Sequence, residues 1–99
     1  MLIDSHCHLD HLDLSDYGNS LDRLLDAARI AGVHRFLSVG VDVESSRLIL
    51  KLSEKYDDVD VSVGVHPLQE SLPVIPTTDQ LIALANHPKV VAIGETGLD

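Results

Sequence analysis

Two histidines separated by one residue stand at the end of the first apolar run of the chain. Successive side chains of a β-strand point to opposite faces, so His6 and His8 would share one face and Cys7 would lie on the other. Two imidazoles side by side at the end of a strand can hold one divalent metal ion in a cleft. The alternative is that one histidine is a satisfied polar residue of the core and the other is solvated, and this spacing alone leaves both interpretations open.

The elements that would position this pair alternate regularly along the chain. Short runs rich in β-branched residues predict strands, and apolar residues at helical spacing between capping and terminating residues predict helices. After the opening strand we expect strands at 35–41, 59–65 and 90–95, and helices from Asn19 or Ser20 to Gly32, from Asp42 to about Lys55, and from Thr77 or Thr78 to His87. Such βαβαβαβ order is typical of a parallel sheet with right-handed crossovers, in half of a (β/α)8 barrel or a small open sheet.

The alternation within each strand predicts which side chains share the face of the two histidines. We place Phe36 and Ser38 on that inner face, with the neighbouring apolar residues toward the helices. Asp42, His66 and Glu95 then follow the second, third and fourth strands on the same side. Because the C-terminal ends of the strands carry the chemistry in barrel enzymes, an ionisable group from each strand favours a shared site in a half barrel.

The composition excludes some classes of protein. The chain has 99 residues, with 16 acidic against 7 basic side chains and a net charge of −9. This balance argues against a surface that coats nucleic acid, which would be basic, and leaves carboxylates for binding cations. A single cysteine rules out an internal disulfide and suits a reducing compartment. Because no basic segment precedes the opening apolar run and no apolar stretch approaches ~20 residues, we expect a cytoplasmic protein without a membrane span.

The length of the chain does not suit a closed barrel. Four parallel strands with two open edges make a poor independent domain, and a barrel needs ~250 residues. We therefore expect residues 1–99 to be the N-terminal half of a single metal-dependent hydrolase barrel, an α/β fold of the TIM-barrel type. This half would hold about the first four strands and three helices, and the remainder would be absent.

Three segments of the sequence together point to a family. They are Asp-Ser-His-Cys-His-Leu-Asp at 4–10, Gly-Val-His-Pro at 64–67 and Gly-Glu-Thr-Gly-Leu-Asp at 94–99. In order and rough spacing they resemble the TatD-type metal-dependent deoxyribonucleases, a branch of the amidohydrolase-like TIM-barrel hydrolases. The resemblance extends over the whole of this chain and over the first four strands of the family's barrel.

The resemblance implies a site for one or two divalent metal ions and DNA as the substrate. His6 and His8 correspond to ligands of the first ion, and Glu95 to a catalytic carboxylate that bridges two ions. His66 matches a histidine that lines the phosphate site of the substrate. The remaining ligands, two histidines and an aspartate on later strands, would lie beyond residue 99, so the 99-residue piece alone would lack them.

Phosphodiester hydrolysis explains why such residues would be needed together. The reaction needs a nucleophilic water near neutral pH and a counter-charge for the phosphate, and a divalent metal ion provides both. Two ions ~3.5–4 Å apart can clamp the attacking and leaving oxygens, and a carboxylate between them offsets their repulsion. Bound cations would also let an acidic protein bind DNA locally. Oxygen ligands favour Mg²⁺ or Mn²⁺ and histidines also allow Zn²⁺, so the sequence does not choose the metal.

Five further residues have less direct parts in this hypothesis. We expect Asp10 to brace its loop or a metal-binding histidine rather than bind metal, and Asp99 either to orient a ligand or to be solvated. Asp42 is first a helix cap, and Cys7 is a packed thiol on the helix side. His11 lies in the loop above the site and could be structural or functional.

Two other functions stay open. A related amidohydrolase-like enzyme that cuts a C–N or ester bond would use the same paired histidines. The 94–99 segment favours the nuclease, because many cyclic-amide hydrolases bridge their metals with a carboxylated lysine instead. The other function is that of a catalytically incomplete fragment that self-associates through its open sheet edges.

Overall fold

The structure is a computed structural model that describes residues 1–67 and 76–97. Within these residues the elements in chain order are β1 (Leu2–Cys7), the short 3-10 helix η1 (Ser15–Tyr17), α1 (Leu21–Ile30), β2 (Val33–Val39), α2 (Val43–Ser53), β3 (Val59–Val63), α3 (Thr78–Ala85) and β4 (Val90–Ile93). The predicted alternation of strands and helices is confirmed, and η1 is an addition that the sequence reasoning did not include.

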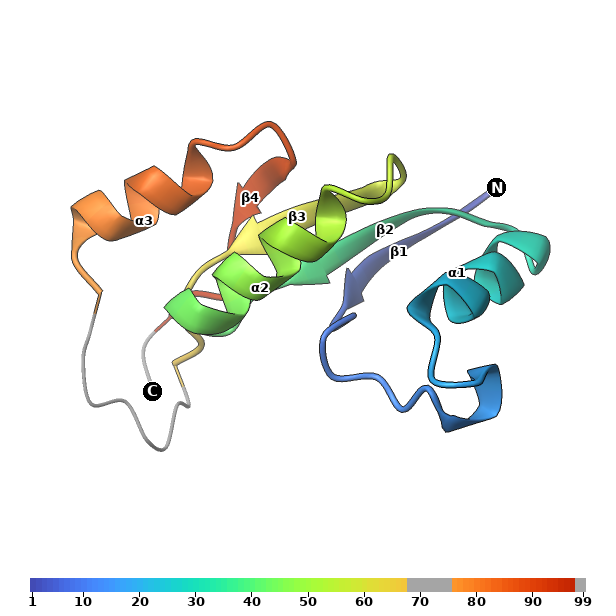
Figure 1. Cartoon of the computed structure of the whole chain (residues 1–99). Helices are drawn as coiled ribbons and strands as arrows, with labels where there is room; N and C mark the ends of the chain where they lie inside the picture. Colours follow the sequence, from blue (N-terminus) through green and yellow to red (C-terminus); the bar gives the residue numbers. More distant parts are fainter. Residues whose placement is uncertain (68–75, 98–99) are drawn as a thin grey trace.

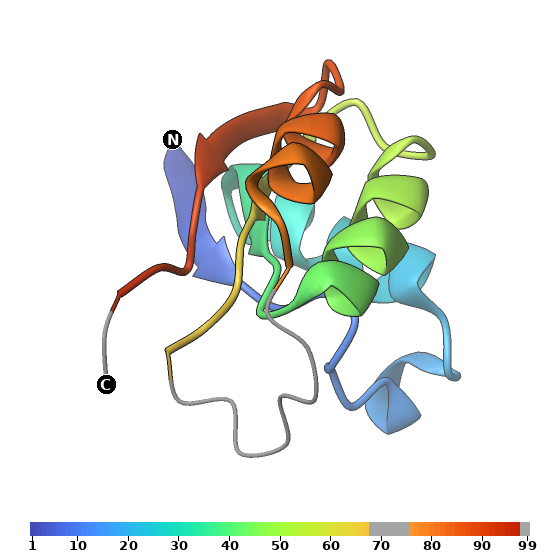
Figure 2. The same cartoon turned by 90° about the vertical axis from the view of Figure 1, so that its left-hand side faces the viewer.

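The four strands of the described region form one sheet in the order β1-β2-β3-β4, and every neighbouring pair is parallel. The helices cover one face of this sheet, so that strands and helices form two layers (Figure 1, Figure 2). In these layers α1 contacts β2, α2 contacts β2 and β3, and α3 contacts β3 and β4. Parallel strands joined by helices on a single side are the arrangement of a partial (β/α)8 barrel, as the sequence predicts.

Each α-helix begins after a residue whose side chain caps it. Ser20, Asp42 and Thr77 each accept a hydrogen bond from a backbone N–H in the first turn of α1, α2 and α3. In α2 and α3 the side chains of Ser45 and Gln80 also accept a hydrogen bond from the N–H of the capping residue, which completes a capping box. A predicted cap is confirmed for each of these helices.

The core lies between the sheet and the helices and consists of two clusters of buried side chains. One cluster joins α2, β3 and α3, and the other joins the loop after β1 to α1, β2 and β3. Their buried members are Ile49, Leu50, Val61, Val63 and Leu84 in the first cluster and Leu9, Leu25, Phe36 and Val59 in the second. Val61 and Val63 face the helices from alternate positions of β3, as predicted.

The predicted faces of β2 are wrong. In the β2–β3 ladder Phe36 pairs with Val59 and Ser38 pairs with Val61, and paired residues of parallel strands share a face. Phe36 and Ser38 therefore point toward the helices. Ser38 is fully buried there, where its hydroxyl accepts a hydrogen bond from the backbone N–H of Leu9. Apolar residues lie on both faces of β2, so the alternation of polar and apolar residues does not predict its orientation. The Ser38 hydroxyl is buried on the helix side with a hydrogen-bond partner, and it does not lie on the face of the two histidines.

Three strands end at the residue directly before a glycine, and each of them ends earlier than the sequence predicts. β2 stops before Gly40, β3 before Gly64 and β4 before Gly94. A Cβ atom at Gly40 would overlap the Ser46 side chain of α2, and one at Gly64 would lie 2.6 Å from the carbonyl oxygen of Glu95. Glycine is required at these two points because neighbouring segments pass too close for a side chain. The residues that follow these strands consequently lie on loops at the end of the sheet.

β1 and β4 are the edge strands of the described sheet. Each carries two large apolar side chains that are more than half exposed, Leu2 and Ile3 on β1 and Val91 and Ile93 on β4. Self-association through these edges, the half-barrel assignment of residues 1–99 and the cytoplasmic location stay predictions. Within residues 1–67 and 76–97, no helix has both the length and the apolar character needed to cross a membrane.

Candidate metal centre

Three side chains from the two edges of the sheet meet at the C-terminal ends of the strands. His6 lies on β1, His8 directly follows this strand, and Glu95 comes two residues after β4. The Nε2 atoms of His6 and His8 lie 3.7 and 3.9 Å from Oε2 of Glu95. One ligand atom from each residue lies within 4.8 Å of the other two. Because β1 and β4 are not neighbours in the sheet order, the curvature of the sheet brings these groups together.

A backbone carbonyl holds the ring of His8. Nδ1 of His8 lies 3.0 Å from the carbonyl oxygen of Val39, the last residue of β2. A carbonyl oxygen accepts hydrogen bonds and cannot donate them, so Nδ1 carries a proton, and in the neutral form of the ring the lone pair lies on Nε2. Nε2 is the atom that faces Glu95. This is the arrangement that fixes a metal-binding histidine in proteins, with one nitrogen tied to the backbone and the other left for the ion.

His66 approaches the same carboxylate from the loop after β3. Its backbone N–H donates a 2.7 Å hydrogen bond to the carbonyl oxygen of Val41, and its Nε2 lies 3.4 Å from Oε1 of Glu95. The two oxygens of Glu95 therefore face different histidines, Oε2 toward His6 and His8 and Oε1 toward His66. The structure brings these four predicted residues together, and the substrate-binding role of His66 stays a prediction.

Cys7 lies between the paired histidines but on the opposite side of β1. Its side chain packs against the cluster around Leu25 and Phe36, and its thiol donates a hydrogen bond of 3.3 Å to the carbonyl oxygen of Leu37. Burial, and to a smaller extent the charge of Asp4, raises the pKa of the Cys7 thiol to about 12. The packed position predicted for this thiol is confirmed, and the protonated form is unsuited to binding metal.

Sequence reasoning missed two residues of the third strand region that fix the backbone of Glu95. The Ser62 hydroxyl donates a 2.9 Å hydrogen bond to the carbonyl oxygen of Gly94. Gly64 lies against the peptide that joins Gly94 to Glu95, and a Cβ added to Gly64 would come within 3 Å of atoms of both residues. The available signal was a glycine directly after a valine-rich strand, because such a glycine often marks the close approach of another backbone.

The other predicted residues lie outside the group of three. The side chain of Asp10 is 3% exposed, and its Oδ2 lies 3.2 Å from Nε2 of His11, so this carboxylate is tied to its own loop. Oδ1 of Asp42 accepts a 2.6 Å hydrogen bond from the Ser45 N–H. That contact confirms Asp42 as a helix cap, and its carboxylate is not part of the group formed by His6, His8 and Glu95. Asp99 lies outside the described residues.

Comparison with known proteins places these motifs in a family. Residues 3–99 match the family model described as TatD related DNase. The chain is 39% identical over 89 residues to the 3'-5' ssDNA/RNA exonuclease TatD of Salmonella typhimurium, a match that covers 90% of this chain and 34% of that protein. It is 39% identical over 98 residues to the uncharacterized metal-dependent hydrolase YcfH of Escherichia coli, which covers 99% of this chain and 36% of that protein.

A third relative extends the likeness to another bacterium. The uncharacterized metal-dependent hydrolase YabD of Bacillus subtilis is 34% identical over 103 residues, which covers 100% of this chain and 38% of that protein. The chain therefore spans 34% to 38% of the length of these curated relatives. The family match itself runs over nearly the whole chain and includes all three motif segments, at 4–10, 64–67 and 94–99. The chain belongs to the TatD-related DNase family.

Proposed function

We propose that this chain provides part of a divalent-metal-dependent hydrolase that cuts DNA phosphodiester bonds. The observation that carries the proposal is the convergence of three histidines on the Glu95 carboxylate at the C-terminal ends of the parallel strands. That end of the sheet is where barrel enzymes hold their reacting groups. The proposal takes residues 1–99 as the N-terminal half of a single barrel, in keeping with the 34% to 38% of each relative that the chain covers.

His6, His8 and Glu95 would hold one or two divalent cations. Two imidazole nitrogens and a carboxylate converge on one point, and the hydrogen bond from His8 to Val39 leaves Nε2 of His8 with its lone pair. Relatives named as metal-dependent hydrolases support a metal, and the mixed nitrogen and oxygen donors are compatible with Mg²⁺, Mn²⁺ or Zn²⁺. A bound cation would lower the pKa of a water molecule and would place a positive charge next to the phosphate.

Residues of the chain itself would place the phosphodiester. His66 presents Nε2 beside Oε1 of Glu95, so an imidazole N–H at this point can donate to a phosphate oxygen held next to the carboxylate. Oε1 of Glu95 is then the acceptor closest to the phosphate, and it can orient a water for attack by accepting its hydrogen bond. Because Ser62 and Gly64 fix the backbone of Glu95, the carboxylate would keep this position when the substrate binds.

The rival function is hydrolysis of a C–N or ester bond at the same centre. One relative is named a 3'-5' ssDNA/RNA exonuclease, and this name favours a phosphodiester substrate. The test therefore offers both kinds of bond to the protein. Bis-p-nitrophenyl phosphate and single-stranded DNA and RNA represent phosphodiesters, and p-nitrophenyl acetate and dihydrouracil represent an ester and a cyclic amide.

The experiment compares the protein with its Glu95→Gln variant in Mg²⁺, Mn²⁺ and Zn²⁺. We expect phosphodiester hydrolysis that depends on added metal and that falls at least about 100-fold in Glu95→Gln, since even residues behind metal ligands are worth 10–100-fold. Glu54→Gln is the matched control, because this carboxylate pairs with His87 near the end of α2 and has no contact with the centre. Metal binding measured by calorimetry should fall in the first variant and stay unchanged in the second.

Each contrary result has a distinct meaning. Full phosphodiesterase activity in Glu95→Gln would exclude the bridging role of this carboxylate. Cleavage of the ester or the cyclic amide without cleavage of any phosphodiester would replace the nuclease with its rival. Absence of all these activities together with sedimentation as a dimer would support the catalytically incomplete, self-associating fragment.

A further inference from the structure

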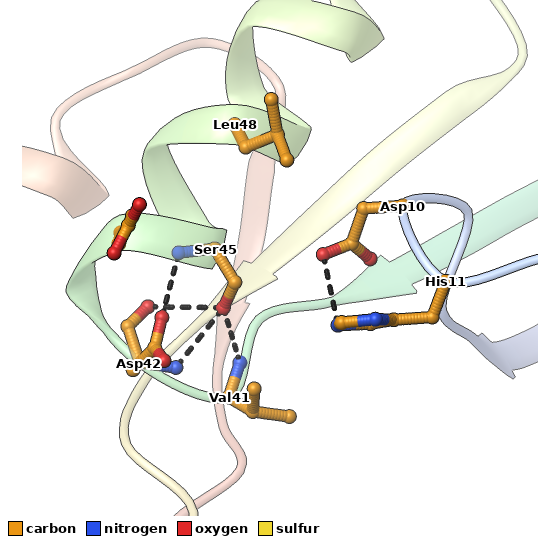
Figure 3. Close-up of a pocket in the computed structure, with 7 residues that line it drawn as sticks. Asp10, His11, Val41, Asp42, Ser45 and Leu48 are labelled. Carbon is orange, nitrogen blue, oxygen red and sulfur yellow. Dashed lines mark hydrogen bonds and ion pairs between the residues drawn. The ribbon is translucent and has the colours of Figure 1, made fainter. Parts of the chain in front are cut away.

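A pocket of about 390 Å³ lies beside the metal centre, between the loop after β1 and the start of α2 (Figure 3). Asp10 and His11 form one wall, and Asp42, Glu44 and Ser45 form the facing wall. Its volume is within the range of small-molecule sites in proteins. The pocket opens at the C-terminal ends of the strands, on the same end of the sheet as the proposed metal ligands.

The His11 ring connects this pocket to the centre. The ring centroids of His8 and His11 lie 6.3 Å apart, and those of His6 and His8 lie 5.2 Å apart, both pairs meeting edge to face. Three imidazoles thus run from the Glu95 carboxylate to the wall of the pocket. A chemical group attached to a phosphate at the centre would extend over this row of rings.

The charges in the pocket exclude a second phosphate. Three of its lining residues, Asp10, Asp42 and Glu44, are carboxylates, and no lysine or arginine of residues 1–67 and 76–97 lines it. Oδ1 of Asp10 is buried and has no hydrogen-bond partner in the described part of the chain, while its Oδ2 lies 3.2 Å from Nε2 of His11. The pocket therefore favours a ligand group that donates hydrogen bonds. The described carboxylates here do not form a metal cluster with the ligand spacing seen at the centre.

An apolar side chain with no role in the core completes the pocket. Leu48 lies on α2 and is 53% exposed, although its neighbours Ile49 and Leu50 are buried in the core. In Figure 3 it stands above the cavity, with Val41 at the opposite side of the opening. Apolar side chains at two sides and hydrogen-bond acceptors between them suit a flat ring that carries amino groups.

We infer that this pocket takes the nucleobase next to the scissile phosphate and prefers bases with an exocyclic amino group. The inference rests on the proposed nuclease function and adds a base preference to it. Cytosine and adenine present an amino donor at the edge where thymine carries a carbonyl and a methyl group, and guanine carries its amino donor on the opposite edge. The carboxylates of Asp42 and Glu44 are the acceptors for that donor, and Leu48 and Val41 contact the ring faces.

The test measures base binding without any need for catalysis. The ¹⁵N-labelled protein is titrated with deoxycytidine and, separately, with thymidine, neither of which carries a phosphate. We expect deoxycytidine to shift the amide signals of Glu44, Ser45 and Leu48, with an affinity at least about tenfold above that of thymidine. Leu48→Ala and Glu44→Gln should each weaken the deoxycytidine shifts.

Two matched controls lie on α3. Ile82→Ala removes an apolar side chain that is 60% exposed, and Asp79→Asn changes the second residue of a helix with a capping box, the position that Glu44 has in α2. Both variants should bind deoxycytidine as the unchanged protein does. Equal affinity for the two nucleosides, or shifts that leave the pocket amides unmoved, would overturn the base preference.

A parallel assay separates this result from the proposed function. Bis-p-nitrophenyl phosphate has no nucleobase, so its metal-dependent hydrolysis reports on the centre and not on the pocket. Hydrolysis without base discrimination would overturn the pocket and leave the proposed function standing. Base discrimination without hydrolysis would overturn the proposed function, and with it the claim that the bound base belongs to a substrate.

Discussion

The two ends of the sheet use charged side chains in opposite ways. Near the N-terminal ends of the strands, Arg29 binds both carboxylate oxygens of Asp58 at 2.7 and 2.9 Å, and Arg35 binds Asp60 at 2.9 Å. At the C-terminal ends, three histidines surround Glu95 at 3.4 to 3.9 Å. The first set has hydrogen-bond lengths and guanidinium donors, while the second has longer separations and imidazole rings.

This difference assigns a separate task to each end. Charges that are paired at hydrogen-bond distance have their partners within the chain and serve to hold strands and helices together. The histidines and the carboxylate that converge at the C-terminal ends bring nitrogen and oxygen donors to one point, which suits the binding of a ligand. Barrel enzymes in general divide their two ends in this way, with stability at the N-terminal end and chemistry at the C-terminal end.

The largest expected effect comes from removing one of the proposed metal ligands at the C-terminal end. His6→Ala should weaken the binding of Mn²⁺ at least about 100-fold, by analogy with the 10–100-fold losses caused by residues behind metal ligands. Because the His6 side chain is 55% exposed, the free energy of unfolding without metal should change by less than about 0.5 kcal/mol. Calorimetry and urea denaturation measure the two quantities. A large loss of stability in metal-free buffer would show that this end also holds the fold.

A second substitution should affect both metal binding and stability. Gly64→Ala would press a Cβ against the backbone of Glu95, so we expect a loss of about 1–3 kcal/mol in the free energy of unfolding together with weaker Mn²⁺ binding. Gly32→Ala, between α1 and β2 at the other end of the sheet, is the control, because φ at Gly32 is +108° and an L side chain is strained there without a close contact. The control should lose stability and keep its metal affinity. Equal metal affinity in both variants would contradict the role given to Gly64.

A smaller effect is expected at the N-terminal end. Arg29→Ala should lower the free energy of unfolding by about 1 kcal/mol at pH 7, since the ion pair is partly exposed, and should leave Mn²⁺ binding unchanged. The Arg29 guanidinium holds the pKa of Asp58 below its ordinary value, so the stabilisation is present above the ordinary carboxyl pKa and is lost as pH falls through the lowered one.

The pH dependence of this pair is therefore a test by itself. The free energies of unfolding of the protein and of Arg29→Ala, measured by urea denaturation, should differ at pH 7. They should converge as the pH falls below about 4, the pKa of an unpaired aspartate. Arg47→Ala, at an exposed arginine of α2, serves as the control and should show no such convergence. If the difference in the free energy of unfolding between the protein and Arg29→Ala grew as the pH fell, the pKa of Asp58 would be raised by folding and not lowered.

The smallest effect concerns a side chain at the C-terminal end that faces the helices. Because the pKa of Cys7 is raised to about 12, its thiol should stay unreactive toward Ellman's reagent at pH 8 while the protein is folded. Addition of urea should restore the ordinary reaction of a free thiol. Rapid modification of the folded protein would mean that this face of β1 is open to solvent, and the division between the two faces would then fail.

The sequence predicted the parts of the fold that depend on local signals. The helix caps Ser20, Asp42 and Thr77 follow from side chains that satisfy free backbone amides, and the paired histidines follow from the two-residue period of a strand. These features need few distant contacts. The order of strands could also be predicted, because each crossover helix restricts its two strands to parallel pairing.

The missed features depend on contacts between distant segments. The face of Phe36 was misjudged because β2 is apolar on both sides, and the choice is made by the partner strand. The contact between Gly64 and the Glu95 backbone joins segments 31 residues apart, which no local period can reveal. The pocket beside Leu48 likewise forms between a loop and a helix, so its existence follows from packing and not from a motif.

The alternation of side chains along the end of β1 has one more consequence. Cys7 and Leu9 pack into the buried cluster that holds α1 against the sheet, while His6 and His8 between and beside them face the candidate ligand. Ligand binding and unfolding are then linked equilibria, because unfolding must release both sets of contacts at once. A cation present at 100 times its dissociation constant would add about 2.7 kcal/mol to the free energy of unfolding. The attachment of α1 to the sheet would thus depend on the metal concentration around the protein.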